Sequence, residues 1–156
     1  MELFEWPEEL ETGIALLDEQ HQSFLRQVNR FYIKFRFKQQ KESAEEQLDF
    51  LQNYLLSHFQ AELAFMLEHG YPKARDHQAS HQMLAIQVKQ QALELKAQDY
   101  SPESVEAFCR FVGAWASQHI MQEDMEFCRF LRAARYRKAC QAPGPQGGRI
   151  TKWEQQ

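Results

Sequence analysis

The nine residues HFQAELAFM (58–66) decide the fold, because they interrupt the regular apolar pattern of a helical segment. Upstream leucines recur at steps of three and four: Leu48, Leu51 and Leu55. The next two positions on this stripe are His58 and Glu62, where a helix packed into a core is expected to carry apolar side chains. Each therefore needs a partner inside the core, because burying an unpaired polar group costs on the order of 1–3 kcal/mol.

Four segments of the chain show the apolar period of about 3.6 residues that is typical of packed helices, and none alternates as a strand does. The segment with the interruption begins after Ser43, a capping residue, and stops at Gly70. The next covers about 73–98, and the last opens with Ser101 and Pro102, a cap followed by proline at the first helical position. Four helices with short connections predict an all-α fold, an antiparallel up-down-up-down four-helix bundle.

Two further pieces flank the predicted bundle. Residues 1–17 are expected to form an N-terminal arm against it, with Trp6 and Leu10 as anchors, and a short C-terminal helix follows the fourth segment. The end of the chain is rich in glycine and proline, which is typical of a flexible tail. We therefore expect one domain, residues 1–138, and a C-terminal tail, residues 139–156.

Composition and charge narrow the class of protein. The chain has 156 residues, enough for one domain with a core, and its net charge of −4 argues against a nucleic-acid-binding surface. No stretch approaches the roughly 18 apolar residues of a membrane span, and the acidic N-terminus lacks the features of a secretory signal. The cysteines are odd in number and lack metal-type spacing, so we interpret them as reduced thiols of a cytoplasmic protein: Cys109, Cys128 and Cys140.

The polar interruption recurs in every one of the four segments. Each places at least one histidine on its apolar stripe: His21, His58, the pair His77 and His81, and His119. Each helical residue rises about 1.5 Å, and neighbouring segments have similar residue counts between these positions and the turn that joins them. In an antiparallel bundle the histidines and Glu62 are therefore expected in one cross-sectional layer.

The spacings of these residues suit metal ligation. Two pairs are four residues apart, which puts both members on one helical face: His58 with Glu62, and His77 with His81. Asp124 follows His119 by five residues, which on an ideal helix places it about 140° away around the axis. It reaches the layer only if the helix ends or distorts between the two. Otherwise it is a surface residue beside Glu123, and spacing alone favours neither alternative.

The types of side chain in the layer indicate the kind of metal. Five imidazoles and two carboxylates favour a first-row transition metal over magnesium or calcium. Seven ligands also exceed the four of a tetrahedral zinc site. Two metal ions bridged by the carboxylates use all seven, with three histidines on one ion and two on the other. The second ion then keeps a vacant position.

In sequence order, the motifs of this chain resemble those of the hemerythrin family over about residues 4–135. They are Trp6, TGIALLDEQH (12–21), HFQAE (58–62), MLEHGYP (66–72), HQASH (77–81) and WASQHIMQED (115–124). The resemblance implies a four-helix bundle with a non-haem di-iron centre that binds dioxygen reversibly. It also implies that Asp124 is a ligand.

The resemblance further implies a role for each ligand. Three histidines belong to the coordinatively saturated iron: His77, His81 and His119. Two belong to the iron that receives dioxygen: His21 and His58. The bridging carboxylates are Glu62 and Asp124, and a solvent-derived oxo or hydroxo group completes the bridge between the two iron ions, Fe2+ or Fe3+.

Four apolar positions are similar to the oxygen pocket of the family: Phe24, Phe59, Trp115 and Ile120. Phe24 stands where an aliphatic residue is usual, and a ring there narrows the pocket or slows ligand exchange. Leu63 replaces a common second glutamate, and Phe127 stands where a tyrosine often follows the aspartate. None of these departures removes a ligand.

Three functions are compatible with this sequence. The first is an oxygen-binding protein, not an enzyme, that serves oxygen storage, transport or sensing. The second is a di-iron enzyme, either an oxidase, a peroxidase or a nitric oxide scavenger, and the third is a redox-sensing module with a separate output partner. We favour the first, because oxidising di-iron bundles use glutamate-rich sites whereas this set is rich in histidine. The expected partner is dioxygen, with no nucleic acid and no membrane.

Overall fold

The computed structural model describes residues 3–37 and 43–141, whose regular secondary structure is all helical, with no strand. The long helices are α1 (Ala15–Tyr32), α2 (Ala44–Glu68), α3 (Ala74–Ala97), α4 (Pro102–His119) and α5 (Met125–Gln141). Three short elements accompany them: the 3-10 turn η1 (Glu8–Leu10) and the π-helical segments η2 (Ile33–Phe37) and η4 (Ile120–Asp124). Within the described part of the chain, no helix combines the length and the apolar character needed to cross a membrane.

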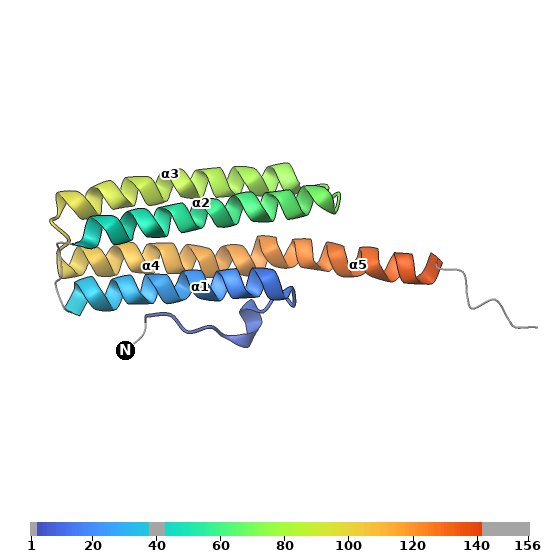
Figure 1. Cartoon of the computed structure of the whole chain (residues 1–156), viewed down its shortest axis with the longest axis horizontal. Coiled ribbons are helices and arrows are strands. Elements are labelled where there is room, and N and C mark those ends of the chain that lie inside the picture. Colours follow the sequence, from blue (N-terminus) through green and yellow to red (C-terminus); the bar gives the residue numbers. More distant parts are fainter. Residues whose placement is uncertain (1–2, 38–42, 142–156) are drawn as a thin grey trace, which may run out of the picture.

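Helices α1 to α4 lie side by side as an antiparallel bundle, as the sequence predicts (Figure 1). Helix α2 packs against α1 and α3, and α4 packs against the same two helices. The segment η4 joins α4 to α5 in one continuous rod that extends beyond the bundle (Figure 1). Helix α5 continues to Gln141, past the expected domain boundary at residue 138. The turn expected near residue 40 and most of the expected tail lie outside the described residues.

The helix ends follow the local signals in the sequence. Helix α4 begins at Pro102, and the Ser101 side chain accepts a hydrogen bond of 3.3 Å from the Ser104 backbone N–H. Helix α2 begins directly after Ser43 as expected, but the side chain of Ser43 makes no capping hydrogen bond. After α2 the chain reverses at Gly70, whose φ of +65° is a conformation that glycine adopts without strain.

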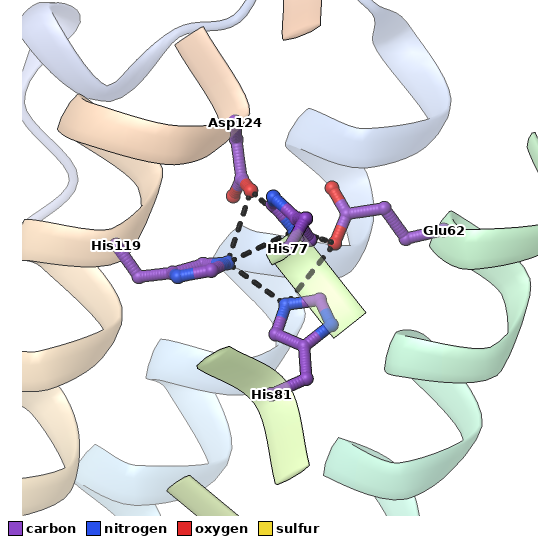
Figure 2. Close-up of side chains that lie close together, drawn as sticks. All are labelled: Glu62, His77, His81, His119 and Asp124. Atoms are coloured by element: carbon purple, nitrogen blue, oxygen red, sulfur yellow. Dashed lines mark hydrogen bonds and ion pairs between the residues drawn. The ribbon is translucent and has the colours of Figure 1, made fainter. Parts of the chain in front are cut away.

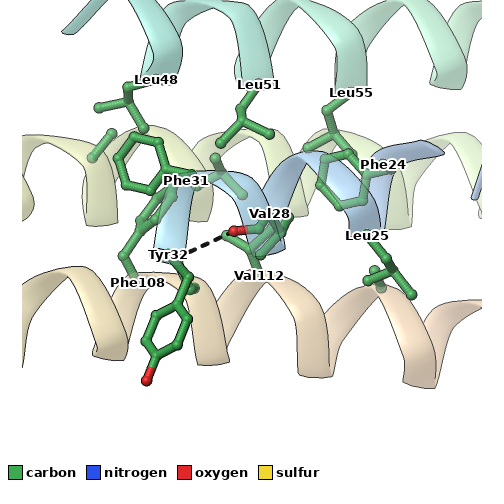
Figure 3. Packing of buried hydrophobic residues seen from close by; sticks show 14 of the residues in the cluster. Phe24, Leu25, Val28, Phe31, Tyr32, Leu48, Leu51, Leu55, Phe108 and Val112 are labelled. Atoms are coloured by element: carbon green, nitrogen blue, oxygen red, sulfur yellow. Dashed lines mark hydrogen bonds between the residues drawn. The ribbon is translucent and has the colours of Figure 1, made fainter. Parts of the chain in front are cut away.

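The core consists of two apolar clusters at different heights in the bundle. In the larger one, leucines of α2 face aromatic and aliphatic residues of α1 and α4 (Figure 3). The smaller cluster lies toward α5: Leu17, Met66, Tyr71, Ala74, Phe127, Cys128 and Leu131. Helices α1, α2 and α3, and the rod formed by α4, η4 and α5, therefore each contribute residues to both apolar clusters, and the polar positions singled out above lie between the two.

The N-terminal arm is fastened to α1 by a buried amide. The Oδ1 atom of Asn29 accepts hydrogen bonds from the backbone N–H groups of Leu3 and Phe4, and Asn29 Nδ2 donates to the Phe4 carbonyl at 2.7 Å. The Phe4 ring approaches α4 at Gly113, where a Cβ would lie 2.2 Å from two ring atoms. Of the predicted anchors, Leu10 is buried, and Trp6 is partly buried against the larger cluster.

Candidate metal centre

One buried layer of polar side chains separates the two apolar clusters. It contains seven residues, each at most 8% exposed: His21, His58, Glu62, His77, His81, His119 and Asp124. They come from α1, α2, α3, α4 and η4. These are the seven residues that the sequence analysis selected, and the structure places all of them in one layer.

Five of the seven form one compact group (Figure 2). The Nε2 atoms of its histidines face one another, with His119 Nε2 at 2.8 Å from His81 Nε2 and 3.2 Å from His77 Nε2. Glu62 Oε2 lies 3.3 Å from His77 Nε2 and 3.5 Å from His81 Nε2. Asp124 Oδ1 lies 3.2 Å from His119 Nε2. One ligand atom from each of the five residues thus lies within 4.8 Å of all the others.

The remaining two histidines form a second group that shares the same carboxylates. His21 Nε2 and His58 Nε2 are 3.2 Å apart. Glu62 Oε2, which faces the first group, also lies 3.8 Å from His58 Nε2. Asp124 turns its other oxygen, Oδ2, toward His21 Nε2 at 3.3 Å. Both carboxylates therefore lie between a group of three imidazoles and a group of two.

A local change of helix type brings Asp124 into the layer. Between His119 and Met125 the rod is π-helical, with i→i+5 rather than i→i+4 hydrogen bonds. Five residues then make about one turn, so Asp124 returns to the face that carries His119. The structure thus decides the alternative that spacing left open, because Asp124 has no exposed surface. π-Helical turns of this kind occur frequently at functional sites.

Neighbouring side chains fix the orientation of several imidazoles. The Nδ1 atom of His58 lies 2.8 Å from Gln20 Oε1, and the Tyr54 hydroxyl donates to the Gln20 carbonyl. The Phe59 ring stacks on His81 with 3.7 Å between centroids. Sequence reasoning missed Gln20, although its position directly before His21 on an inward-facing turn is a signal that points to it. Partners of this kind hold a histidine in one tautomer and one ring orientation.

Burial lowers the pKa of four of the imidazoles, His21, His58, His77 and His81, which favours their uncharged form at neutral pH. The pKa of His58 is lowered to about 3 by burial and by neighbouring His21. The pKa of His81 is lowered to about 2 by burial and by His119 and His77. An uncharged imidazole offers a lone pair, which is the form that binds a metal ion.

The two carboxyl groups respond to burial in opposite ways. Burial raises the pKa of Glu62 well above its usual value, and the nearby charge of Asp124 raises it further. Burial also acts to raise the pKa of Asp124, but the adjacent imidazoles of His119 and His21 outweigh it, so the pKa of Asp124 is lowered. Without a cation, the surroundings therefore shift Glu62 toward its protonated form and Asp124 toward its ionised form.

The chemistry of the layer fits bound metal ions. Five of its buried atoms have no hydrogen-bond partner within the described residues: His21 Nδ1, Glu62 Oε1, His119 Nδ1, and Oδ1 and Oδ2 of Asp124. A buried polar atom left unpaired costs about 1–3 kcal/mol. Cations among the converging Nε2 and carboxylate atoms would compensate the carboxylate oxygens of this set. Imidazole with carboxylate, and no thiolate, suits iron and its first-row neighbours.

A small apolar cavity adjoins the two-histidine group. It has a volume of about 20 Å³ and is lined by His21, Phe24, Leu55, His58, Phe59, Trp115, Ala116, His119, Ile120 and Asp124. This lining includes all four residues predicted for an oxygen pocket, and adds Leu55 and Ala116, which lie three residues before His58 and His119. A single water needs about 10–15 Å³ of such space, so the cavity admits a very small molecule. A larger groove between α2 and α3, lined by Leu56 and Ile86, contains none of the seven residues.

A comparison with known proteins shows the family to which the chain belongs. The model of the hemerythrin HHE cation binding domain matches residues 12–131. The chain belongs to the hemerythrin family. The resemblance inferred from the motifs of the sequence is thereby confirmed.

Two bacterial relatives and one solved structure illustrate this membership in the hemerythrin family. Bacteriohemerythrin of Stenotrophomonas maltophilia is 28% identical over 134 residues, which cover 85% of this chain and 84% of the relative. Bacteriohemerythrin of Clostridium acetobutylicum is 25% identical over 129 residues, which cover 80% of this chain and 98% of the relative. A crystal structure of wild-type hemerythrin is similar with a TM-score of 0.69 at 25% identity, covering 81% of this chain and 96% of that chain.

Proposed function

We propose that this hemerythrin-family chain is a non-haem di-iron protein that binds dioxygen reversibly, for storage, delivery or sensing. The observation that carries the proposal is the apolar cavity of about 20 Å³ beside the two-histidine group. This cavity provides space for a very small neutral molecule directly beside a candidate metal site. Membership of the family, with relatives named bacteriohemerythrin, supports the same conclusion.

In this proposal the three-imidazole group and the two-imidazole group each hold one iron ion. Glu62 and Asp124 would be ligands available to both ions, because each carboxylate lies between the two groups. Bound iron would supply the electrons and the Lewis acidity that dioxygen binding requires. The chain itself supplies fixed ligands and a dry surrounding. Phe24, Phe59 and Ile120 are each at most 8% exposed and border the cavity, so they shield the two-histidine group from bulk water.

We propose binding rather than catalysis, because the cavity lacks the groups that an enzyme needs. Apart from the members of the polar layer, its lining is apolar. It therefore has no separate acid or base to move a proton, and it has no room to orient an organic substrate. We also propose a cytoplasmic location, which the free buried thiols of Cys109 and Cys128 support.

Elemental analysis and an optical titration test this proposal. Protein expressed in iron-replete cells should contain two iron atoms per chain. After reduction, it should gain a visible charge-transfer band in air and lose it under argon over several cycles. An enzyme consumes reductant at each exposure instead. One iron atom per chain, or a first exposure after which no dioxygen can be recovered, would refute reversible binding.

A further inference from the structure

Glu123 lies between two histidines of the three-imidazole group, on the side of the rings that faces away from the group. Its Oε1 atom is 3.3 Å from His119 Nδ1, and its Oε2 atom is 3.7 Å from His77 Nδ1. The two Nε2 atoms of the same rings point inward, where they are 3.2 Å apart. One carboxylate thus reaches the outer nitrogens of two rings that belong to different helices.

The position of Glu123 matters because a ligating imidazole needs an acceptor for the proton on its Nδ1 atom. A neutral imidazole whose Nε2 lone pair binds a metal ion carries its proton on Nδ1, so Nδ1 must donate. His119 Nδ1 is buried and has no hydrogen-bond partner in the described part of the chain. The Glu123 Oε1 atom lies 3.3 Å from it, at ion-pair distance, so this carboxylate is the acceptor that faces the outer nitrogen of the ring.

The π-helical segment places Glu123 beside these rings. Glu123 is four residues after His119, and its neighbour Asp124 is five residues after it. The two adjacent acidic residues therefore act on opposite nitrogens of one ring. Asp124 Oδ1 lies 3.2 Å from His119 Nε2, and Glu123 Oε1 faces His119 Nδ1.

Glu123 remains in contact with solvent, unlike the imidazoles that it faces. Its side chain is 36% exposed, whereas those of His77 and His119 are 3% and 4% exposed. It borders a polar surface hollow together with Tyr71, Lys73, Asp76, His77, Ser80 and Glu126. In that hollow Lys73 pairs with Glu126 at 2.5 Å. Replacing Glu123 therefore removes a carboxylate without opening a cavity in the core, so its variants should fold.

We propose that Glu123 is a positioning residue that holds His77 and His119 together through their Nδ1 atoms. It keeps both rings in the tautomer whose Nε2 is free for the metal, and it links α3 to η4. The role as support for iron rests on the proposed di-iron function, whereas the control of the two tautomers does not require iron. Carboxylates behind ligating histidines raise the basicity of the ligand, and their loss lowers metal affinity about 10- to 100-fold.

Three variants separate this role from a general effect of charge. Glu123→Ala removes the acceptor, Glu123→Gln keeps the shape with one neutral oxygen, and Glu126→Gln removes a charge from the same hollow without touching a histidine of the layer. The first measurement is the rate at which reduced, iron-loaded protein loses iron to a ferrous chelator. We expect about 10- to 100-fold faster loss for Glu123→Ala, a smaller increase for Glu123→Gln, and the wild-type rate for Glu126→Gln.

The second measurement is the ¹⁵N spectrum of the histidine rings in iron-free protein. We expect wild-type His77 and His119 to carry the proton on Nδ1, and Glu123→Ala to shift both rings toward a mixture of tautomers. Unchanged ring signals with unchanged iron loss in Glu123→Ala would overturn the proposal, as would an equal effect of Glu126→Gln. A wild-type protein that binds no iron would refute the proposed function, while the ring signals would still decide whether Glu123 positions the two histidines.

Discussion

The replacement of Glu62 by methionine should have opposite effects on stability and on iron binding. Glu62 is 1% exposed, its Oε1 atom has no hydrogen-bond partner, and burial raises its pKa well above the usual value. Methionine keeps the length of the side chain and restores the apolar stripe of α2. Removing one unpaired buried oxygen recovers about 1–3 kcal/mol, partly offset by the loss of the 3.3 Å hydrogen bond between Glu62 Oε2 and His77 Nε2, so for a chain of this size the melting temperature should rise by at most about 12 °C.

The same variant should bind iron more weakly than the wild type. Glu62 Oε2 lies between His77, His81 and His58, so its loss removes the carboxylate shared by both imidazole groups. We expect the iron content to fall well below two atoms per chain, and the melting temperature to become insensitive to iron. Calorimetry with and without iron, together with elemental analysis, measures both effects.

A matched change on the same helix serves as the control. Glu68 is exposed near the end of α2, so Glu68→Met makes the same substitution outside the layer. It should leave the iron content and the response of the melting temperature to iron as in the wild type. If iron-free Glu62→Met melts below the wild type, or if it retains two iron atoms, the interpretation of Glu62 as a metal ligand held at a cost in stability is wrong.

Three further predictions concern the layer, the cavity and the arm. Below about pH 6.5, the free energy of unfolding of iron-free protein should fall by up to about 1.4 kcal/mol per pH unit for each imidazole such as His58 or His81, because the unfolded chain takes up protons that the folded layer does not. The raised pKa of Glu62 acts in the opposite sense and offsets part of this loss. Urea unfolding at about pH 7.5 and about pH 5.5 measures the difference, and higher stability in acid would contradict the prediction. Phe24→Ala should remove an apolar ring from the cavity lining, so that more water reaches the two-histidine group and the oxygenated absorption band in air has a shorter lifetime; an unchanged lifetime would show that Phe24 does not protect the site. Gly113→Ala should displace the arm, because its Cβ would lie 2.2 Å from the Phe4 ring, so limited proteolysis should cut the arm faster; wild-type resistance would mean that Phe4 packs elsewhere.

The bundle and most of the layer could be predicted because both depend on short-range regularities. The cap at Ser101 and Pro102 fixes the start of α4, and the reversal at Gly70 fixes the end of α2. Constant rise per residue then sets the relative heights of positions on neighbouring helices. A histidine on an apolar stripe is visible in the sequence, and residue counting is enough to predict that His21, His58, His77 and His119 share one layer.

Other features could not be predicted because they depend on side-chain rotamers and on departures from ideal helix geometry. Asp124 turns inward only because η4 is π-helical, and residue spacing by itself gave no preference for that geometry. The contact of Gln20 with His58 and that of Glu123 with His77 involve the outer nitrogen of each ring, which a helical wheel does not represent. The arm depends on Asn29, whose amide bonds the backbone 25 residues earlier in the chain.

The position of the layer between two apolar clusters links its chemistry to folding. Buried polar groups without partners destabilise a core, and within the described residues those of the layer come from α1, α2, α4 and η4 at one height. The apolar residues on either side, such as Leu55 toward the larger cluster and Met66 toward the smaller, bring the four helices together whether or not a metal is bound. The bundle can therefore present a nearly complete ligand set before iron arrives, and iron binding then stabilises mainly the middle of the bundle.

Hydrogen exchange should accordingly slow on iron binding near His58 and His81, and much less near Leu48 and Leu95, which lie far from the layer in the larger cluster. Equal slowing along the whole of α2 and α3 would mean instead that iron is required for the bundle to assemble at all.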